Sequence, residues 1–180
     1  SAIDYDAKGN LSSTPGVSQS SATLTWDIDN QLASYTKDSV TTTFTYDALG
    51  RRLEKLNPAK STLYIRADLQ VIEEYESIGA GSYTLVRCCG QGTYIDDILA
   101  KVEAFSTPTV LYYHSDRQIN VRGLTNSSGE ITELYAYTPY WKQCVLNASG
   151  TEIGSSAFDN NYGYTGRYLD TEIGLWYFRA

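Results

Sequence analysis

The 180-residue sequence has no methionine, one histidine, three cysteines and four prolines. No stretch approaches the roughly 18 consecutive apolar residues of a membrane-spanning helix, so we expect no membrane span. Lys and Arg number 14 against 21 Asp and Glu, and they form no run longer than Arg51-Arg52. Proteins bind nucleic acid largely through Lys and Arg side chains that replace the counterions of the phosphates. At a net charge of −7 this chain has few such groups in excess, so we expect no nucleic-acid partner. The start at Ser1-Ala2, without any methionine, suggests a processed chain or a cut fragment.

The three cysteines, Cys88, Cys89 and Cys144, form no complete disulfide framework. Adjacent cysteines rarely bridge one another because the ring is strained. A bridge from Cys144 to one of the pair and three free, packed thiols are both open alternatives. The one histidine, His114, is distant in sequence from the cysteines, and a zinc site needs about four ligands. We therefore expect no metal and no cofactor.

The sequence is rich in tyrosine and glycine, with 16 and 14 residues. Tyrosine suits half-buried sheet surfaces because its body is apolar and its tip is polar. Residues 22–26, 42–46 and 130–137 alternate between polar residues and apolar or aromatic ones, which is typical of strands. Turn-forming residues fall between such runs. These patterns predict an all-β fold.

A repeat occupies the first fifty or so residues. Each unit has an aromatic residue, Asp, two variable residues, Gly or Asn, one or two polar residues and then Leu. The repeat residues are Tyr5, Asp6, Gly9; Trp26, Asp27, Asn30; and Tyr46, Asp47, Gly50, Arg51. As a β-hairpin, the unit would use Asp to cap the turn and Gly or Asn to adopt positive φ. Hairpins stacked edge to edge would form one continuous sheet.

These units resemble the YD repeats of the Rhs/YD-repeat family, and residues 44–53 do so most closely. Later segments resemble, in the same order, those that run from the repeats into the Rhs-associated core motif. The residues assigned to the core motif are His114, Asp116, Arg122, Gly166, Arg167, Asp170, Gly174 and Leu175. Two turns depart from the family pattern, at residues 117–120 and at Thr138 and Trp141. These departures put the local turn geometry in doubt.

The resemblance implies stacked antiparallel β-hairpins in a curved or spiralling sheet, part of an Rhs-type shell. Residues 1–56 would be YD repeats, and residues 57–180 a core-like β region continuous with them in a single domain. A chain of this length supports on the order of ten to fifteen strands. The exposed sheet edges would pair with the remainder of the parent chain or with another copy.

The resemblance also implies a structural and interaction role in a secreted or cell-surface protein. The scaffold would enclose or display another domain for toxin delivery or surface contact. The family's aspartyl self-cleavage motif would lie beyond Ala180. We therefore expect no catalytic residues in this chain and no enzyme activity.

Two other classes of function stay open. In the first, exposed aromatic residues bind a carbohydrate or another surface, with Trp141 on a loop after Pro139 as the leading contact. In the second, His114 and Asp116 form an acid–base pair of a hydrolase, since residues i and i+2 share one face of a strand. No nucleophile is recognisable near that pair in the sequence.

Clustered carboxylates suggest two further sites. Glu73-Glu74, Asp96-Asp97 and Asp170 with Glu172 are candidate pairs for glycoside hydrolysis. Oxygen ligands for calcium could come from Asp27, Asp29 and Asn30, or from residues 159–161. Turn capping explains the same residues more simply.

Overall fold

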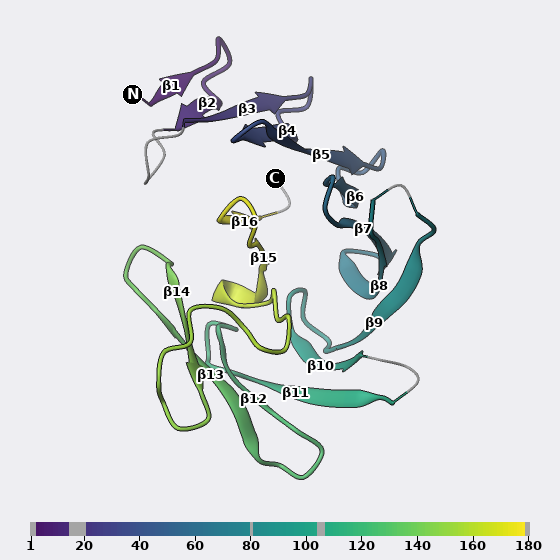
Figure 1. The fold of residues 1–180 in the computed structure, drawn as a ribbon, viewed down its shortest axis with the longest axis vertical. Coiled ribbons are helices and arrows are strands. Elements are labelled where there is room, and N and C mark those ends of the chain that lie inside the picture. Colours follow the sequence, from purple (N-terminus) through teal and green to yellow (C-terminus); the bar gives the residue numbers. More distant parts are fainter. Residues whose placement is uncertain (1–2, 15–20, 80, 104–106, 179–180) are drawn as a thin grey trace. The chain divides into compact units, whose positions relative to one another are not determined.

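The computed structural model describes residues 3–14, 21–79, 81–103 and 107–178. These ranges consist of strands, turns and one short 3₁₀ turn, η1 (Tyr164–Gly166). Fourteen strands form a single antiparallel sheet in which each strand is hydrogen-bonded to the next along the chain (Figure 1). The predicted all-β fold of stacked antiparallel hairpins is confirmed.

The strand order of the sheet follows the chain order without a crossover. Its strands are β1 (Asp4–Tyr5), β2 (Leu11–Thr14), β3 (Ala22–Trp26), β4 (Leu32–Lys37), β5 (Val40–Tyr46), β6 (Arg52–Leu56), β7 (Ser61–Ala67), β8 (Gln70–Ser77), β9 (Thr84–Gln91), β10 (Ile98–Glu103), β11 (Thr109–Ser115), β12 (Val121–Thr125), β13 (Ile131–Tyr137) and β14 (Gln143–Asn147). A separate hairpin pairs β15 (Tyr168–Asp170) with β16 (Leu175–Tyr177).

The chain divides into two compact units. The first contains the described residues of 1–65 and 74–85, and the second contains residues 66–73 and the described residues of 86–178. The boundary expected between residues 56 and 57 stays a prediction.

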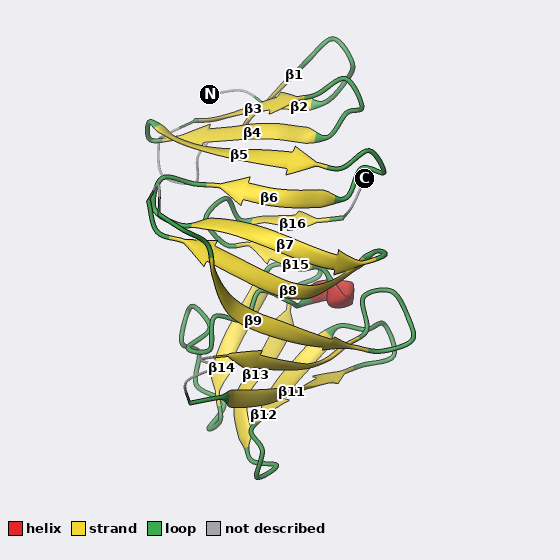
Figure 2. Cartoon of the chain, turned by 90° about the vertical axis from the view of Figure 1, so that its right-hand side faces the viewer, coloured by secondary structure: helices red, strands yellow, loops and turns green. Residues whose placement is uncertain are grey.

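The core of the first unit follows from the alternation of its strands. Leu24 in β3 and Phe44 in β5 are buried, whereas their neighbours in sequence point to solvent more often. Arg52 is also buried, with its guanidinium 5.5 Å from the ring centroid of Phe44 and 5.1 Å from that of Tyr64. These contacts are favourable because an aromatic face attracts a cation. Figure 2 shows β3 to β6 side by side.

Seven described turns that begin with Asp, Asn or Thr share one backbone geometry, which the turn from Gly163 to Arg167 also has. The N–H of the first turn residue donates to the carbonyl of the fifth, and the N–H of the fourth donates to the carbonyl of the first. The fourth residue has positive φ. The turns begin at Asp6, Asp27, Asp47, Asp116, Asn126, Thr138 and Asn147, and their fourth residues are Gly9, Asn30, Gly50, Ile119, Gly129, Trp141 and Gly150.

Side chains cap these turns in the same way. In the six turns that begin with Asp or Asn, the Oδ1 atom accepts the N–H groups of the third and fifth residues. In the seventh, Thr138 Oγ1 accepts the N–H of Lys142 at 3.2 Å. The two turns whose sequences depart from the family pattern therefore keep the common geometry. Each of these two turns places a non-glycine residue, Ile119 or Trp141, in the left-handed region, which strains the backbone there.

The aromatic residue before a turn links that hairpin to the preceding one. Trp26 Nε1 donates to the carbonyl of Leu11 at 2.7 Å, and Tyr46 Oη donates to that of Leu32 at 2.9 Å. Tyr137 repeats this contact in the second unit, with its hydroxyl 2.8 Å from the carbonyl of Val121. Each acceptor is the residue that follows the fifth position of an earlier turn, at Asp6, Asp27 or Asp116. In the first unit, an aromatic–Asp pair therefore caps its own turn and bonds to the preceding hairpin.

The three cysteines are free thiols in this structure, with Cys89 buried and the other two half-buried. Burial, and secondarily the charge of Glu73, raises the pKa of Cys88. Burial and a hydrogen bond with Glu152 raise the pKa of Cys144. Among the described residues, no helix is long and apolar enough to span a lipid bilayer.

Candidate functional site

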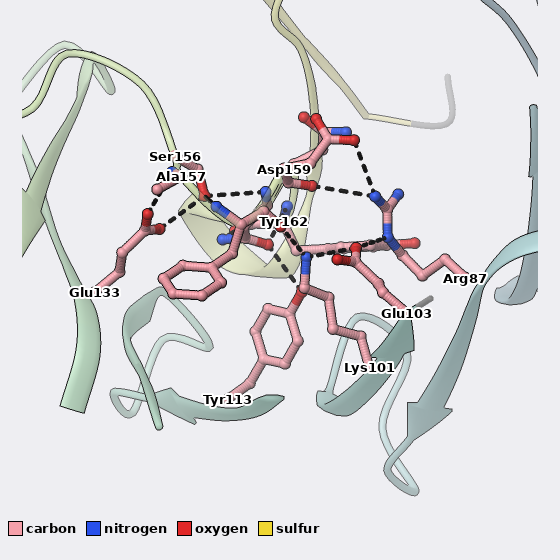
Figure 3. Close-up of polar contacts among 12 residues, drawn as sticks. Arg87, Lys101, Glu103, Tyr113, Glu133, Ser156, Ala157, Asp159 and Tyr162 are labelled. Atoms are coloured by element: carbon pink, nitrogen blue, oxygen red, sulfur yellow. Dashed lines mark hydrogen bonds and ion pairs between the residues drawn. The ribbon is translucent and has the colours of Figure 1, made fainter. Parts of the chain in front are cut away.

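In the second unit, residues 156–162 are held on one face of the sheet by polar side chains from β9, β10, β11 and β13 (Figure 3). Strand alternation places these side chains together, since Lys101 and Glu103 are two residues apart, as are Glu133 and Tyr135. We call these contacts the polar network.

Glu133 is the centre of one half of the polar network, and only 1% of its surface is exposed. Its Oε1 accepts the N–H of Ala157 at 2.6 Å, and its Oε2 accepts the hydroxyl of Ser156 at 2.7 Å. Oε2 also accepts the hydroxyl of Tyr135. Burial and this carboxylate raise the pKa of Tyr135, so the phenol keeps the proton that it donates. The buried charge is thus compensated by three donors.

Lys101 and Arg87 form the other half. Lys101 is 0% exposed, and its Nζ donates to Glu103 Oε1 at 2.8 Å and to the carbonyl of Phe158. Arg87 Nε donates to the same Glu103 oxygen at 2.6 Å, and its terminal nitrogen lies 3.1 Å from Asp159 Oδ2. Burial and the nearby Arg87 lower the pKa of Lys101, and Glu103 opposes that shift. Both cations therefore pair with Glu103 of the sheet. Each also contacts the overlying segment, Lys101 at the carbonyl of Phe158 and Arg87 at the carboxylate of Asp159.

Asn160 forms a third part of the polar network. Its Oδ1 accepts the hydroxyl of Tyr113 at 2.8 Å and the N–H of Tyr162 at 3.1 Å, and its Nδ2 donates to the carbonyl of Tyr162 at 2.9 Å. The rings of Tyr113 and Tyr162 meet edge to face, 6.3 Å apart. The polar network thereby fixes both the backbone and the side chains of residues 156–162.

A cavity of about 820 Å³ lies in the same unit. Its walls come from the turn at residues 138–142, from β14, from residues 154–161 and from the β15–β16 hairpin with Phe178. Indole rings of Trp141 and Trp176 line it together with the amide side chains of Gln143 and Asn161. Trp141, the residue predicted to contact a ligand, is 50% exposed.

The structure does not assemble the predicted His114–Asp116 pair. A β-bulge between His114 and Ser115 interrupts the alternation that would place both side chains on one face. His114 is exposed and its Nε2 lies 2.9 Å from Thr125 Oγ1. Asp116 instead bonds within its turn, to Asn120, and to Arg122 Nε at 2.8 Å.

The other core-motif residues have structural contacts. Arg122 also lies 5.5 Å from the ring centroid of Tyr137, and Arg167 pairs with Asp96 at 3.3 Å. Gly166 packs so closely on Asp96 that an added Cβ would collide with its carbonyl. The carbonyl of Asp170 accepts the N–H groups of residues 173 and 174 in the β15–β16 turn. Gly174 and Leu175 line the cavity.

The candidate calcium ligands take part in protein contacts. Asp27 Oδ1 caps its turn, Asn30 Oδ1 accepts the amide of Asn10, and residues 159–161 contribute to the polar network and its surroundings. No group of three or more His, Cys, Asp or Glu suited to a metal occurs in the part of the chain that the structure describes. Of the proposed carboxylate pairs, Glu74, Asp96 and Asp170 are buried while Glu73, Asp97 and Glu172 are more exposed.

Glu133, Lys101 and Arg87 were not predicted as site residues from the sequence. Charged residues in strands usually point to solvent, and each of these three has a partner 16 to 72 positions away. One weak sequence indication of burial is that Lys101 interrupts an otherwise apolar stretch in β10.

Comparison of sequences finds known proteins that are similar to nearly the whole chain. The tRNA nuclease WapA of Bacillus subtilis is 26% identical over 99% of this chain, and the double-stranded DNA deaminase toxin A of Burkholderia cenocepacia is 22% identical over 97%. The chain spans only 7% and 14% of those proteins. No family model matches the sequence.

Solved structures show the same fold. A crystal structure of TcdB2-TccC3-Cdc42 aligns with 97% of this chain at a TM-score of 0.67 and 15% identity, and the chain spans 9% of it. The Tc holotoxin pore of Photorhabdus luminescens aligns with 96% of the chain at a TM-score of 0.59. The described sheet is therefore of the kind found in Tc toxin components.

The expectation that the protein is not an enzyme is wrong. The relatives that match nearly the whole chain are named as a nuclease and a deaminase toxin. The expectation rested on the lack of a recognisable nucleophile and self-cleavage motif within 180 residues, which says nothing of the far longer proteins that contain such a segment.

Proposed function

We propose that this chain is a segment of the β-sheet shell of an Rhs/YD-repeat toxin, an exported protein whose shell encloses or displays an enzymatic domain. The observation that carries the proposal is the chain-ordered sheet of hairpins, because it aligns over almost its whole length with Tc toxin components. The shared turn geometry supports the repeat assignment from the first hairpin to the one after β14.

The relatives support the enzymatic part of the proposal. Both WapA and the deaminase toxin are named for chemistry on nucleic acids, and this segment aligns with a small part of each. The protein that contains this segment would accordingly act on a nucleic acid after export to the cell surface or the medium.

The sheet edges support a continuation into the parent chain. Within the described residues, β1 has β2 as its one strand neighbour. The free side of β14 is partly bonded by the residues that follow it, through a bridge between Leu146 and Glu152 and a hydrogen bond from Ile153 to Val145. An unpaired edge attracts another strand, so further repeats of the parent chain would add beside β1.

Limited proteolysis of the full-length gene product tests this proposal. Its nuclease and deaminase activities on tRNA and double-stranded DNA are measured first, and then the survival of the active fragment is followed during digestion. We expect the active fragment to resist protease in the wild-type protein and to be digested faster in Glu133→Ala, which breaks the polar network. The matched variant Glu130→Ala, an exposed glutamate of a neighbouring turn, is expected to behave as wild type. Equal digestion rates in all three proteins, or no activity on either nucleic acid, would count against the proposal.

A further inference from the structure

The aromatic cavity beside β14 has a feature that packing alone does not explain. In the seven capped turns, the fourth residue is Gly four times and Asn once, as the left-handed conformation favours. At the same position Trp141 has φ 64°, and its side chain is half exposed. A bulky residue in this region costs on the order of 1 kcal/mol. Ile119 carries the same strain at the same turn position and does not line the cavity, so Trp141 is distinguished by a half-exposed indole that lines the cavity.

Tyr164 connects the two tryptophans, because its ring packs against both indoles. The ring centroid of Trp141 is 5.8 Å from that of Tyr164, at an interplanar angle of 33°. Trp176 Nε1 donates to the carbonyl of Trp141 at 3.2 Å, and the Trp176 ring lies 6.4 Å from that of Tyr164. Two tryptophans are therefore fixed along one cavity, and a rigid aromatic surface loses little entropy when it binds a ligand.

Polar groups accompany the rings. Gln143, Asn161, Ser155 and Thr171 line the cavity. Asn161 is buried, and the hydrogen bond of its side chain within the described ranges is donated by Nδ2 to Tyr168 Oη. Within the described ranges its side-chain oxygen, Oδ1, accepts no hydrogen bond, whereas its backbone carbonyl accepts the N–H of Leu169. Amides and hydroxyls beside aromatic faces can match a ligand that alternates C–H surface with hydroxyl groups.

Charge narrows the class of ligand. The charged residues in the lining are Lys142 and Asp159, one of each sign, and the Asp159 carboxylate already pairs with Arg87. The cavity therefore has no excess of one charge to select an anionic or cationic ligand. A volume of about 820 Å³ lies within the range of small-molecule sites and suits two or three sugar rings.

We propose that this cavity is a binding site for a neutral oligosaccharide, with Trp141 and Trp176 stacking on the sugar rings and the amide side chains bonding their hydroxyl groups. The site goes beyond the shell role proposed above and does not depend on it.

Tryptophan fluorescence of the 180-residue chain provides the test. A Trp26→Phe background removes the one tryptophan that does not line the cavity, so emission reports on Trp141 and Trp176. The probes are chitotriose, cellotriose, maltotriose and laminaritriose. We expect at least one of them to change the emission saturably, with a Kd below about 1 mM. No saturable change with any of the four up to about 10 mM would overturn the proposal.

Variants separate binding from folding. We expect Trp141→Ala to raise the Kd for the trisaccharide by roughly tenfold or more. Because that variant also loses packing on Tyr164, Ser155→Phe serves as a second test: it fills the cavity from an exposed position. The matched control is Ser128→Phe, an exposed serine of a turn that does not line the cavity. Binding lost in Ser155→Phe and kept in Ser128→Phe, at unchanged Tm, supports the site, whereas equal binding in both contradicts it.

Discussion

The two units of this chain stabilise similar strands by different means. In the first unit, turn caps join residues two and four positions apart, and the aromatic links of Trp26 and Tyr46 reach 15 and 14 positions back. The second unit keeps these local devices and adds the polar network, which includes contacts that span 16 to 72 positions. A repeat can therefore build the sheet by local rules, whereas fixing a non-repetitive segment on its face requires individually placed buried charges.

The largest expected effect comes from breaking the polar network. Glu133→Ala would leave the hydroxyls of Ser156 and Tyr135 and the N–H of Ala157 without their acceptor in a buried place. We expect a loss of about 3 kcal/mol in the free energy of unfolding, since each hydrogen bond to a charged group contributes about 1.5 to 3 kcal/mol and partial relaxation recovers some of it. Urea denaturation of the chain measures this loss.

Glu130→Ala is the control for that prediction. Glu130 is exposed and bonds only within its own turn in the described structure, to Asn126. We expect a change within about 0.5 kcal/mol. If the two variants lost equal stability, the burial of Glu133 would not be what distinguishes the second unit.

A turn cap in the first unit should have a smaller effect. Asp27→Ala removes the acceptor of the N–H groups of Asp29 and Gln31, each at 2.9 Å. We expect a loss of about 1 to 2 kcal/mol, since two partly exposed hydrogen bonds are lost. Hydrogen exchange should show faster opening around β3 and β4, with β10 to β13 unchanged.

Asp27→Asn sharpens this prediction, because asparagine caps the same turn geometry at Asn126 and Asn147. It keeps the Oδ1 acceptor and should cost only a few tenths of a kcal/mol. A loss in Asp27→Asn as large as in Asp27→Ala would show that charge, and not the acceptor geometry, stabilises the turn.

A smaller effect than the loss of the Asp27 cap is an acid sensitivity at Asp116. Burial works to raise its pKa, but hydrogen bonds from Asn120, Gln118 and Arg122 outweigh it and lower the pKa to about 2. Because the folded pKa lies below the ordinary value of 3.8, the stabilisation is complete above that value and is lost as the pH falls toward 2. We expect roughly 1 kcal/mol, since the carboxylate is partly exposed and screened.

Asp116→Asn is the matched variant for the pH experiment. It should be less stable than wild type at neutral pH, and the difference should shrink between pH 3.8 and about 2. A difference that stays constant over this range would mean that the Asp116 charge is not stabilising.

Local features of the fold could be predicted from the sequence, and long-range ones could not. The Tyr-Asp and Trp-Asp units indicate capped hairpins because an Asx cap and a positive-φ residue act within five positions. The turn at Thr138 and Trp141 keeps this geometry although its residues depart from the pattern, because a threonine hydroxyl can replace part of the cap.

The polar network was not predicted because its residues have ordinary local sequence. Apart from the apolar neighbours of Lys101 in β10, nothing close in sequence to Lys101 or Glu133 indicates burial, since each has a partner among residues 156–159, far along the chain. The same holds for Asp159 and its neighbours, which as a cluster of oxygen donors resembled a calcium site and in the structure bond to Arg87 and Tyr113. The ligand contact expected at Trp141 stays a prediction, and the cavity that Trp141 lines was not predicted because its walls come from separate segments of the chain.

A cryo-electron microscopy map of the full-length gene product tests the shell proposal most directly. We predict that β1 to β14 form one sheet with further hairpins, that a strand of the parent chain pairs with the open edge of β1, and that the sheet surrounds density for another domain. A map in which this segment is a separate module, with the edge of β1 unpaired and no enclosed domain, would contradict the proposal.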